Sequence, residues 1–219
     1  MADSLSLVSR LRGRVRDLPR QVAYGPGARL MSELRKRRVI LVHPHATIRF
    51  EGPVYLGPGF SLFIPDPGAT FIVGPGVDFR RGFRAEISRG GTIRIGAGCV
   101  FSYYSLIQCS TSIEIGDRAM FGQSTMLVDG NHRFRDLDRP MVEQGYDYKP
   151  IRIEDDVTVM TKCTLVANIG TRAVVGAHSV VVRDVPPYCV VTGVPARVVD
   201  YFGPPGEEPA ELAERRSAS

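Results

Sequence analysis

The sequence of 219 residues lacks an apolar run long enough to cross a membrane, and its N-terminus lacks the apolar core of a signal peptide. From these absences we expect the protein to reside in the cytoplasm. The length allows one domain with a substantial core and terminal extensions.

Cysteine and histidine are also scarce. The four cysteines form no CxxC pair, which argues against a structural metal site or a disulfide framework; they are Cys99, Cys109, Cys163 and Cys189. We interpret them as small core residues. His43 and His45 alternate on a predicted strand and could share a face, but two histidines are weak evidence for a metal. We predict no metal centre.

Positive charge is concentrated at one end of the chain. Residues 1–40 contain ten basic and three acidic residues, a net charge of +7, so the rest of the chain is near −2. We predict a basic helical arm over residues 1–38, with helices near 4–18 and 27–37.

The first helix places Val8, Leu11, Val15 and Leu18 on one face, with arginines on the other. We expect this face to pack on the body or on a neighbouring subunit, and peripheral contact with an anionic membrane is the alternative. Aromatic residues are not interleaved with the arginines, which disfavours nucleic acid as a partner.

A six-residue spacing of aliphatic residues, often followed by Gly, is the main pattern present. It is too short for a helical solenoid and predicts stacked short strands. The spaced positions are Ile95, Phe101 and Ile107; Ile115, Phe121 and Leu127; Ile153, Val159 and Leu165; and Ile169, Val175 and Val181.

A polar segment, residues 129–150, interrupts this repeat and contains His132. A polar loop on a rigid repeat is a favourable place for catalytic chemistry. Earlier turns, from about Val39, are less regular. We assign residues 39–200 to the repeat domain, with the loop 129–150 inserted, and expect residues 201–219 to be a disordered tail rich in Pro, Glu, Ala and Arg.

Three features together resemble one known family. They are the six-residue repeat, the loop sequence DGNHRFRD at 129–136, and the ending RDVPPY…GVPAR between 183 and 197. The sequence is similar to the left-handed parallel β-helix (hexapeptide-repeat) acyltransferases, in particular their maltose/galactoside, polysaccharide O-acetyltransferase and xenobiotic acetyltransferase branches. The match covers about 90–200, and 40–90 more loosely.

This resemblance implies an all-β fold: a left-handed parallel β-helix of about eighteen residues per coil, with an N-terminal helical arm and an inserted loop. It also implies a homotrimer with active sites between subunits and acetyl-CoA as the acyl donor. His132 matches the catalytic histidine of the family, and a neutral imidazole suits a general base near pH 7. Asp129, Asp136 and Glu143 remain alternatives for orienting its ring.

The family binds coenzyme A along the later coils. The resemblance places Thr161, Ala177, Val182, Arg183 and Arg197 there, with the two arginines suited to phosphates. His178 sits at a corner where we expect positive φ. Two departures fall nearby: Met160 replaces an expected glycine, and 165–169 is two residues short, which predicts a tightened or distorted corner.

The sequence therefore predicts a CoA-dependent acyltransferase that moves an acetyl group from acetyl-CoA to a sugar or polysaccharide-precursor hydroxyl. A xenobiotic (antibiotic) acetyltransferase and a non-catalytic β-helical scaffold or binding module are the alternatives. The expected partners are other copies of the chain and a small-molecule or saccharide acceptor.

Overall fold

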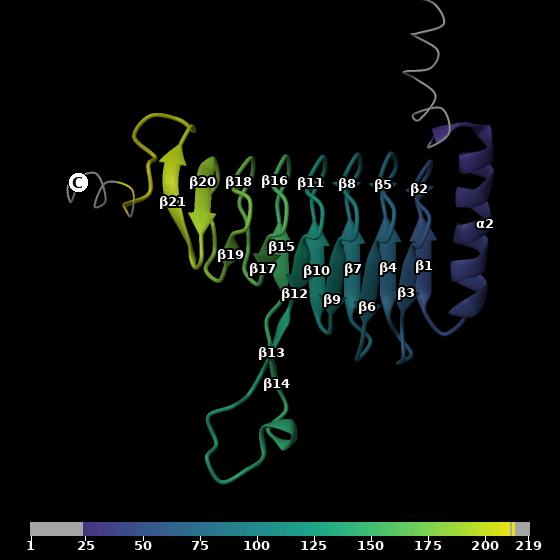
Figure 1. The fold of residues 1–219 in the computed structure, drawn as a ribbon, viewed down its shortest axis with the longest axis horizontal. Helices are drawn as coiled ribbons and strands as arrows, with labels where there is room; N and C mark the ends of the chain where they lie inside the picture. The colour runs from purple at the N-terminus through teal and green to yellow at the C-terminus, as the bar shows by residue number, and fades with distance from the viewer. Residues whose placement is uncertain (1–23, 211, 213–219) are drawn as a thin grey trace, which may run out of the picture.

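Three parallel sheets surround one core in the computed structural model, which describes residues 24–210 and 212. The earlier coils each contribute one strand to each sheet, whereas the last coils meet the first sheet only through isolated bridges at Ile169 and Val185. All the coils stack along a single axis (Figure 1). Helix α2 (Pro26–Val42) crosses one end, and strands β20 (Cys189–Gly193) and β21 (Ala196–Tyr201) close the other. The parallel, mostly-strand architecture confirms the expected fold class at this level. The helix predicted over 4–18 lies outside the described residues.

Inward and outward side chains alternate along these short strands. The first sheet contains β1 (Thr47–Phe50), β4 (Thr70–Val73), β7 (Thr92–Ile95), β10 (Ser112–Ile115) and β15 (Ile151–Ile153). The second contains β2 (Tyr55–Leu56), β5 (Asp78–Phe79), β8 (Val100–Phe101), β11 (Met120–Phe121), β16 (Thr158–Val159), β18 (Val174–Val175), β20 and β21. The third contains β3 (Ser61–Phe63), β6 (Arg84–Ile87), β9 (Leu106–Cys109), β12 (Met126–Val128), β17 (Thr164–Leu165) and β19 (Val180–Val181).

Two of the three corners keep one length from coil to coil. The corner from the first sheet to the second spans four residues, as at 96–99 and 116–119, and so does the corner from the second to the third, as at 102–105 and 122–125. In the later coils the third residue of each corner has positive φ. The expected positive φ at His178 is confirmed at 60°. Each corner also stacks on the next, since His178 N donates to the Thr161 carbonyl at 2.9 Å.

The corner from the third sheet back to the first, here called the return corner, contains the variation in coil length. It spans residues 64–69, 88–91, 110–111 and 129–150, and then 166–168 and 182–184 before the bridges at Ile169 and Val185. Phe79 pairs with Phe101, 22 residues later, whereas Val159 pairs with Val175, only 16 residues later. The described coils therefore vary on either side of the roughly eighteen residues per coil that the resemblance implies.

The shortened segment 165–169 is tight but regular, so of the two outcomes that we expected, a tightened or a distorted corner, the structure has the first. Arg152 N donates to Asn168 Oδ1 at 2.8 Å, and Asn168 N donates to Asp184 Oδ1 at 3.1 Å. The next return corner has the same short length, with Asp184 at its end. Two equal short corners stack in register because side-chain oxygens accept the backbone donors of the coil before them.

The core follows the change in coil length. Phe79, Phe101 and Phe121 stack in the longer coils, with ring centroids 5.1 and 4.6 Å apart. Val159 and Val175 occupy the matching positions in the shorter coils, where less volume is enclosed. All four cysteines are buried and free, as the core interpretation predicts. Burial raises the pKa of Cys99 to about 11 and that of Cys109 to about 12.

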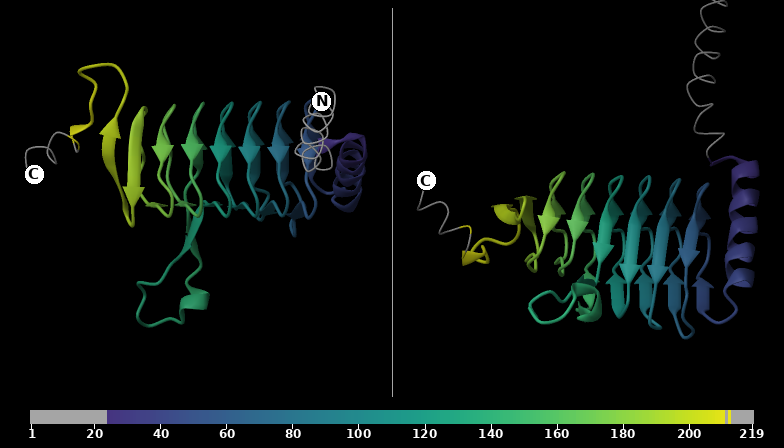
Figure 2. Two further views of the ribbon diagram at one scale, coloured as in Figure 1. Left: turned by 45° about the horizontal axis from the view of Figure 1, so that its top comes forward. Right: turned by 60° about the horizontal axis from the view of Figure 1, so that its bottom comes forward.

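Helix α2 covers the open edge of the first coil with polar side chains. Leu56 N donates to Ser32 Oγ at 2.8 Å, and Arg35 Nη1 donates to the Leu56 carbonyl at 2.9 Å. Backbone groups of an end strand that lack a neighbouring coil are satisfied in this way. Figure 2 shows the helix lying across the end of the stack in both views.

His43 and His45 complete this cap. The His43 Nε2 atom lies 3.2 Å from the Leu62 carbonyl, and the His45 Nε2 atom lies 3.0 Å from the Ile64 carbonyl. The two rings contact each other edge-to-face, but they lie in the turn between α2 and β1 and not on the strand that we predicted. Their role here is structural, and the described residues contain no His, Cys, Asp and Glu cluster suited to a metal ion.

The C-terminal segment packs back onto the body in part. Leu212, within the stretch that we expected to be disordered, is 4% exposed. Residues 211 and 213–219 lie outside the described part of the chain. Among the helices described, none is both long and apolar enough to cross a membrane.

Candidate functional site

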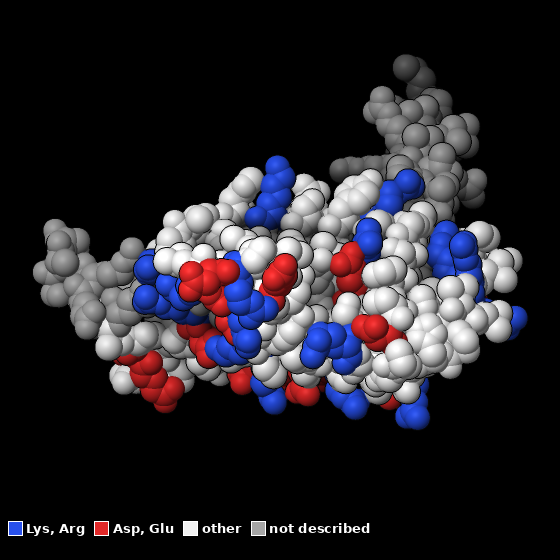
Figure 3. Space-filling view, turned by 90° about the horizontal axis from the view of Figure 1, so that it is seen from below, with Lys and Arg blue, Asp and Glu red and all other residues white. Residues whose placement is uncertain are grey.

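The longest return corner, residues 129–150, forms a loop that projects sideways from the stack. Strands β13 (Gly130–His132) and β14 (Tyr146–Tyr148) form its antiparallel stem, and a short 3-10 turn (Met141–Glu143) lies farther out. Figure 3 views the molecule from the loop side, where basic and acidic side chains are interspersed. A β-stem at the base of the loop fixes the position of His132 relative to the body.

His132 lies at the end of β13, opposite Tyr146 on β14. The two rings are 4.2 Å apart at their centroids and tilted by 38°. Within the described residues the His132 ring makes no hydrogen bond or ion pair, and it is exposed to solvent. Both ring nitrogens are therefore available to a substrate, and the tyrosine limits how the ring can turn.

Asp129 does not orient His132 in this structure, although it was one of three candidate acids. Its buried carboxylate accepts hydrogen bonds from Ser110 N (2.8 and 2.9 Å), Thr111 N (2.7 Å) and Thr111 Oγ1 (2.8 Å). These are the two residues of the preceding return corner. Asp129 thus anchors the loop to the coil before it.

The other two acids also have different contacts. Asp136 exchanges hydrogen bonds with Gln144 and Asp138 inside the loop, and the backbone carbonyl of Glu143 accepts a bond from Arg139. Within this single chain, none of the three proposed acids forms a hydrogen bond or ion pair with the His132 ring. Its immediate partner in the described structure is the aromatic ring of Tyr146.

Replacing Asp129 with Ala is expected to lower the free energy of unfolding by about 2–4 kcal/mol, because the half-buried backbone donors of Ser110 and Thr111 lose the buried carboxylate that accepts their hydrogen bonds. Urea unfolding of the two proteins measures the difference. Asp136→Ala is the matched control, since that carboxylate is exposed, and a change within about 0.5 kcal/mol is expected. Equal stability of wild type and Asp129→Ala would contradict the anchoring role.

A groove of about 550 Å³ opens beside His132, between the loop stem and the earlier return corners. We call it the loop groove; its lining includes Glu86, Arg89, Gln108, His132, Tyr146 and Tyr148. Gln108 Nε2 donates to Glu86 Oε2 at 2.7 Å, and Arg84 Nη2 lies 2.7 Å from Glu86 Oε1. The floor of the groove therefore presents a carboxylate and an amide in fixed orientations.

Aromatic rings form the wall on the loop side. Tyr146 and Tyr148 stack with centroids 5.6 Å apart, and the Arg89 guanidinium lies 5.4 Å from the Tyr148 ring centroid. Gly130 makes room for this wall, because a Cβ there would lie 2.6 Å from the Tyr148 ring. Sequence reasoning missed these tyrosines. Their alternation, opposite Gly-Asn-His across a loop, was the available hairpin signal.

The five residues expected to bind the donor occupy three places. Thr161 and Ala177 lie side by side on stacked corners between the second and third sheets. Val182 and Arg183 follow β19 in a return corner, so β19 separates the two pairs. Arg197 lies on β21, opposite Thr192, at the end of the stack. Met160 is exposed beside Thr161.

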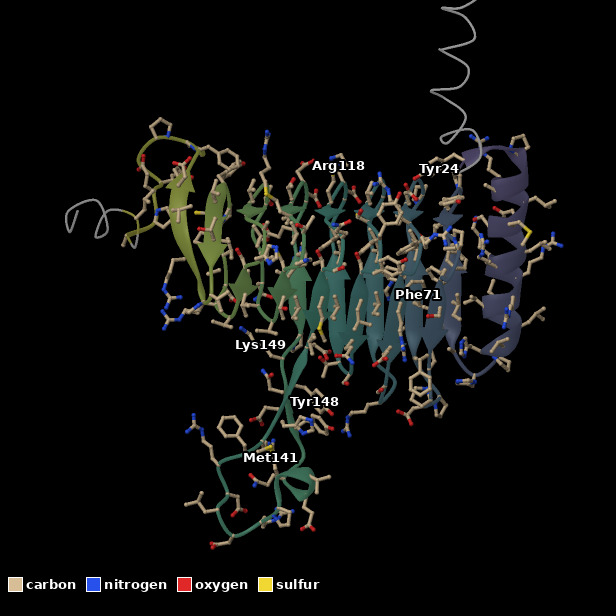
Figure 4. The ribbon with its side chains drawn as sticks, viewed as in Figure 1. Tyr24, Phe71, Arg118, Met141, Tyr148 and Lys149 are labelled. Carbon is tan, nitrogen blue, oxygen red and sulfur yellow. The ribbon has the colours of Figure 1, made fainter. Side chains whose placement is uncertain are left out.

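The end of the loop is tied to the later coils. Lys149 Nζ lies 3.3 Å from Asp184 Oδ1, next to Arg183 in sequence. Burial acts to raise the pKa of Asp184, but hydrogen bonds from Asn168 and Lys149 outweigh it and hold that pKa below its usual value. Figure 4 shows Lys149 where the loop leaves the body, with Tyr148 and then Met141 farther out. This contact links the His132 loop to the expected donor side.

Comparison with known proteins finds relatives that are named as acetyltransferases. The chain is 31% identical over 181 residues to the probable acetyltransferase Rv3034c of Mycobacterium tuberculosis, covering 81% of this chain and 58% of that protein. It is 30% identical over 116 residues to the galactoside O-acetyltransferase of Escherichia coli, covering 51% and 55%. The chain thus spans little more than half the length of these two relatives. No family model matches.

Solved structures agree with these relatives. The hexapeptide-repeat acetyltransferase VCA0836 of Vibrio cholerae is 34% identical, with a TM-score of 0.54 over 60% of this chain and 73% of that one. Its complex with acetyl coenzyme A is 26% identical over 90% of both chains, with a TM-score of 0.55. Together with the repeated coils and the His132 loop, these likenesses place the chain in the hexapeptide-repeat acyltransferase superfamily.

Proposed function

We propose that the protein is an acetyl-CoA-dependent O-acetyltransferase that acts on a hydroxyl of a sugar or polysaccharide precursor. The observation that carries this proposal is the exposed His132 ring at the loop groove, whose lining combines aromatic rings with oriented polar groups. The likeness to a galactoside O-acetyltransferase, and to an acetyltransferase solved with acetyl coenzyme A, supports it.

His132 acts as the general base. As the acceptor oxygen attacks the thioester carbonyl, an imidazole nitrogen takes the hydroxyl proton. The new C–O bond forms and the C–S bond then breaks. The departing thiolate recovers the proton from the imidazolium, so atoms and charge balance and no acyl-enzyme is needed. Contact with Tyr146 limits the orientations of the ring, which favours productive alignment.

The loop groove holds the acceptor. Glu86 and Gln108 offer hydrogen-bond acceptors and donors at fixed positions, as adjacent hydroxyls of a sugar require. Tyr146 and Tyr148 provide apolar surface for the ring carbons. A small number of placed polar groups among aromatic side chains is typical of small-molecule sites.

The donor lies along the later coils, beyond Lys149. Thr161 and Ala177 contact the pantetheine arm from one edge of the third sheet, and Val182 and Arg183 approach from its other edge. Arg183 and Arg197 meet the phosphates, since guanidinium groups bind phosphate with paired hydrogen bonds. We also propose that the coil is left-handed, as the superfamily resemblance implies.

The proposed assembly is a homotrimer. Loop side chains such as Leu137, 96% exposed, and Val142, 84% exposed, extend away from the body, and burial on a neighbouring subunit accounts for them. A neighbour also supplies acceptor contacts that one protomer lacks. Light scattering gives the mass of the purified assembly, and a monomer at micromolar concentration would contradict this part of the proposal.

Titration calorimetry with acetyl-CoA tests the donor site. The wild type is expected to bind, and Arg183→Ala is expected to raise Kd by about tenfold, roughly 1.4 kcal/mol, through the loss of a phosphate contact. Arg172→Ala, an exposed arginine on another edge of the stack, is the control and should bind like wild type. Absence of binding at millimolar acetyl-CoA would instead favour the non-catalytic scaffold.

A turnover screen tests the acceptor class. Purified protein with acetyl-CoA is offered mono- and oligosaccharides beside antibiotics with free hydroxyls, and released coenzyme A is measured. Turnover of saccharides supports the proposal. Turnover confined to antibiotics would favour the xenobiotic acetyltransferase instead.

A further inference from the structure

The two faces of α2 have opposite chemistry. The face toward the first coil is mainly polar: Ser32 and Lys36 are buried there, Arg35 bonds a backbone carbonyl, and Val39 packs on the core. The face away from the body carries Leu30, Leu34 and Leu41, which are 62%, 48% and 78% exposed. A helix that only capped the solenoid would place leucines inward and polar groups outward. The arrangement here is the reverse.

Basic residues border the exposed leucines. At 100° per residue, Leu30, Leu34 and Leu41 form one narrow stripe, and Arg37 and Arg38 fall on either side of it. Both arginines are exposed, and neither forms an ion pair with another described residue. We call this stripe and its two arginines the outer face of α2. At the α2 end of the molecule, Figure 3 shows blue side chains predominating over red.

Charge selects among possible occupants of this face. Residues 1–40 carry a net charge of +7, so two copies brought together through α2 would repel each other. The complementary partner is negatively charged. Nucleic acid fits poorly, because exposed leucines gain nothing from a phosphate backbone, whereas a lipid surface offers both anionic headgroups and apolar chains.

We propose that the outer face of α2 docks on an anionic phospholipid surface, with the three leucines inserted at the headgroup boundary and Arg37 and Arg38 paired with lipid phosphates. This inference is independent of the proposed catalytic function. The helix lies across the end of the stack and the His132 loop leaves from its side, so docking leaves the loop groove accessible (Figures 1 and 2).

Sedimentation with vesicles tests this proposal on the full chain. Vesicles of phosphatidylcholine alone are compared with vesicles containing 30% phosphatidylglycerol, as a probe for anionic lipid. The wild type is expected to bind the anionic vesicles at least about tenfold more strongly. L30S/L34S/L41S is expected to weaken that binding by about tenfold or more, and R37Q/R38Q by about tenfold.

Met120→Ser and Arg94→Gln are the matched controls, because they remove an exposed apolar and an exposed basic side chain elsewhere on the stack. Both should bind vesicles like wild type. Far-ultraviolet circular dichroism verifies that each variant is folded. His132→Ala should also bind normally, which separates this proposal from the catalytic one.

Three results would overturn the docking role of α2. Equal binding to neutral and anionic vesicles removes the electrostatic argument. Wild-type binding by both α2 variants assigns any lipid contact to residues outside α2. A dimer or larger species that the leucine variant alone disrupts, without vesicle binding, identifies a second copy as the occupant.

Discussion

Replacing His132 with Ala is expected to lower kcat by about 10²–10⁴-fold, a loss of roughly 3–5 kcal/mol of transition-state stabilisation. The acceptor hydroxyl would then have to lose its proton to water while it attacks. The side chain is exposed and outside the core, so the variant should unfold at the same temperature as wild type. Steady-state release of coenzyme A, with the acceptor found in the screen, measures the effect.

The control for this experiment is His43→Gln, at the far end of the stack. Glutamine can still donate to the Leu62 carbonyl that His43 meets, so the cap is kept and turnover should be unchanged. Affinity for acetyl-CoA should also be similar in wild type and His132→Ala. Full turnover by His132→Ala would remove this residue from the mechanism.

The second large effect is expected in the core. Phe101 is fully buried between Phe79 and Phe121, whose rings lie 5.1 and 4.6 Å from it. Phe101→Ala removes a whole layer of this stack and should lower the free energy of unfolding by about 3–5 kcal/mol. Because each coil is held by its neighbours, the cavity weakens the coils on both sides.

Denaturant unfolding, followed by circular dichroism, measures this loss. Phe63→Ala makes the same chemical change at an exposed position on β3, and it should cost less than about 1 kcal/mol. If Phe101→Ala and Phe63→Ala lowered the free energy of unfolding by similar amounts, the stacked phenylalanines would not be a major source of stability.

The sequence predicted the regular part of the fold well. Ile95, Ile115 and Ile153 recur at matched positions in the repeat, and in the structure they occupy one column of the first sheet. This works because two corners keep four residues, so inward positions recur without drift. The superfamily resemblance is likewise confirmed by the relatives.

Coil length could not be predicted in the same way. The extra residues at 64–69 and 88–91 hide the first coils from a six-residue pattern, although those coils stack like the rest. The shortened segment at 165–169 looked like a defect in isolation. Only the structure shows that Asn168 and Asp184 make two short corners fit one another.

The sequence predicted some residues of the candidate site and missed others. The position of His132 in an inserted loop followed from the pattern, and its role remains a prediction. Asp129 could not be distinguished from its neighbours by sequence, because its partners, Ser110 and Thr111, lie in the previous coil. Glu86 and Gln108 gave no local signal for the same reason: their proximity arises from stacking of the coils.

Of the three corners of each coil, the return corner is the one that can accept insertions during evolution. An insertion at either other corner would shift core-facing residues and break the hydrogen bonds between stacked corners. The return corner is only two residues long at 110–111 and holds an entire loop at 129–150. The sheets on both sides remain paired in both cases. Descendants of this chain could therefore gain or exchange recognition loops along that one edge without rebuilding the core, and a grafted peptide would be best tolerated there.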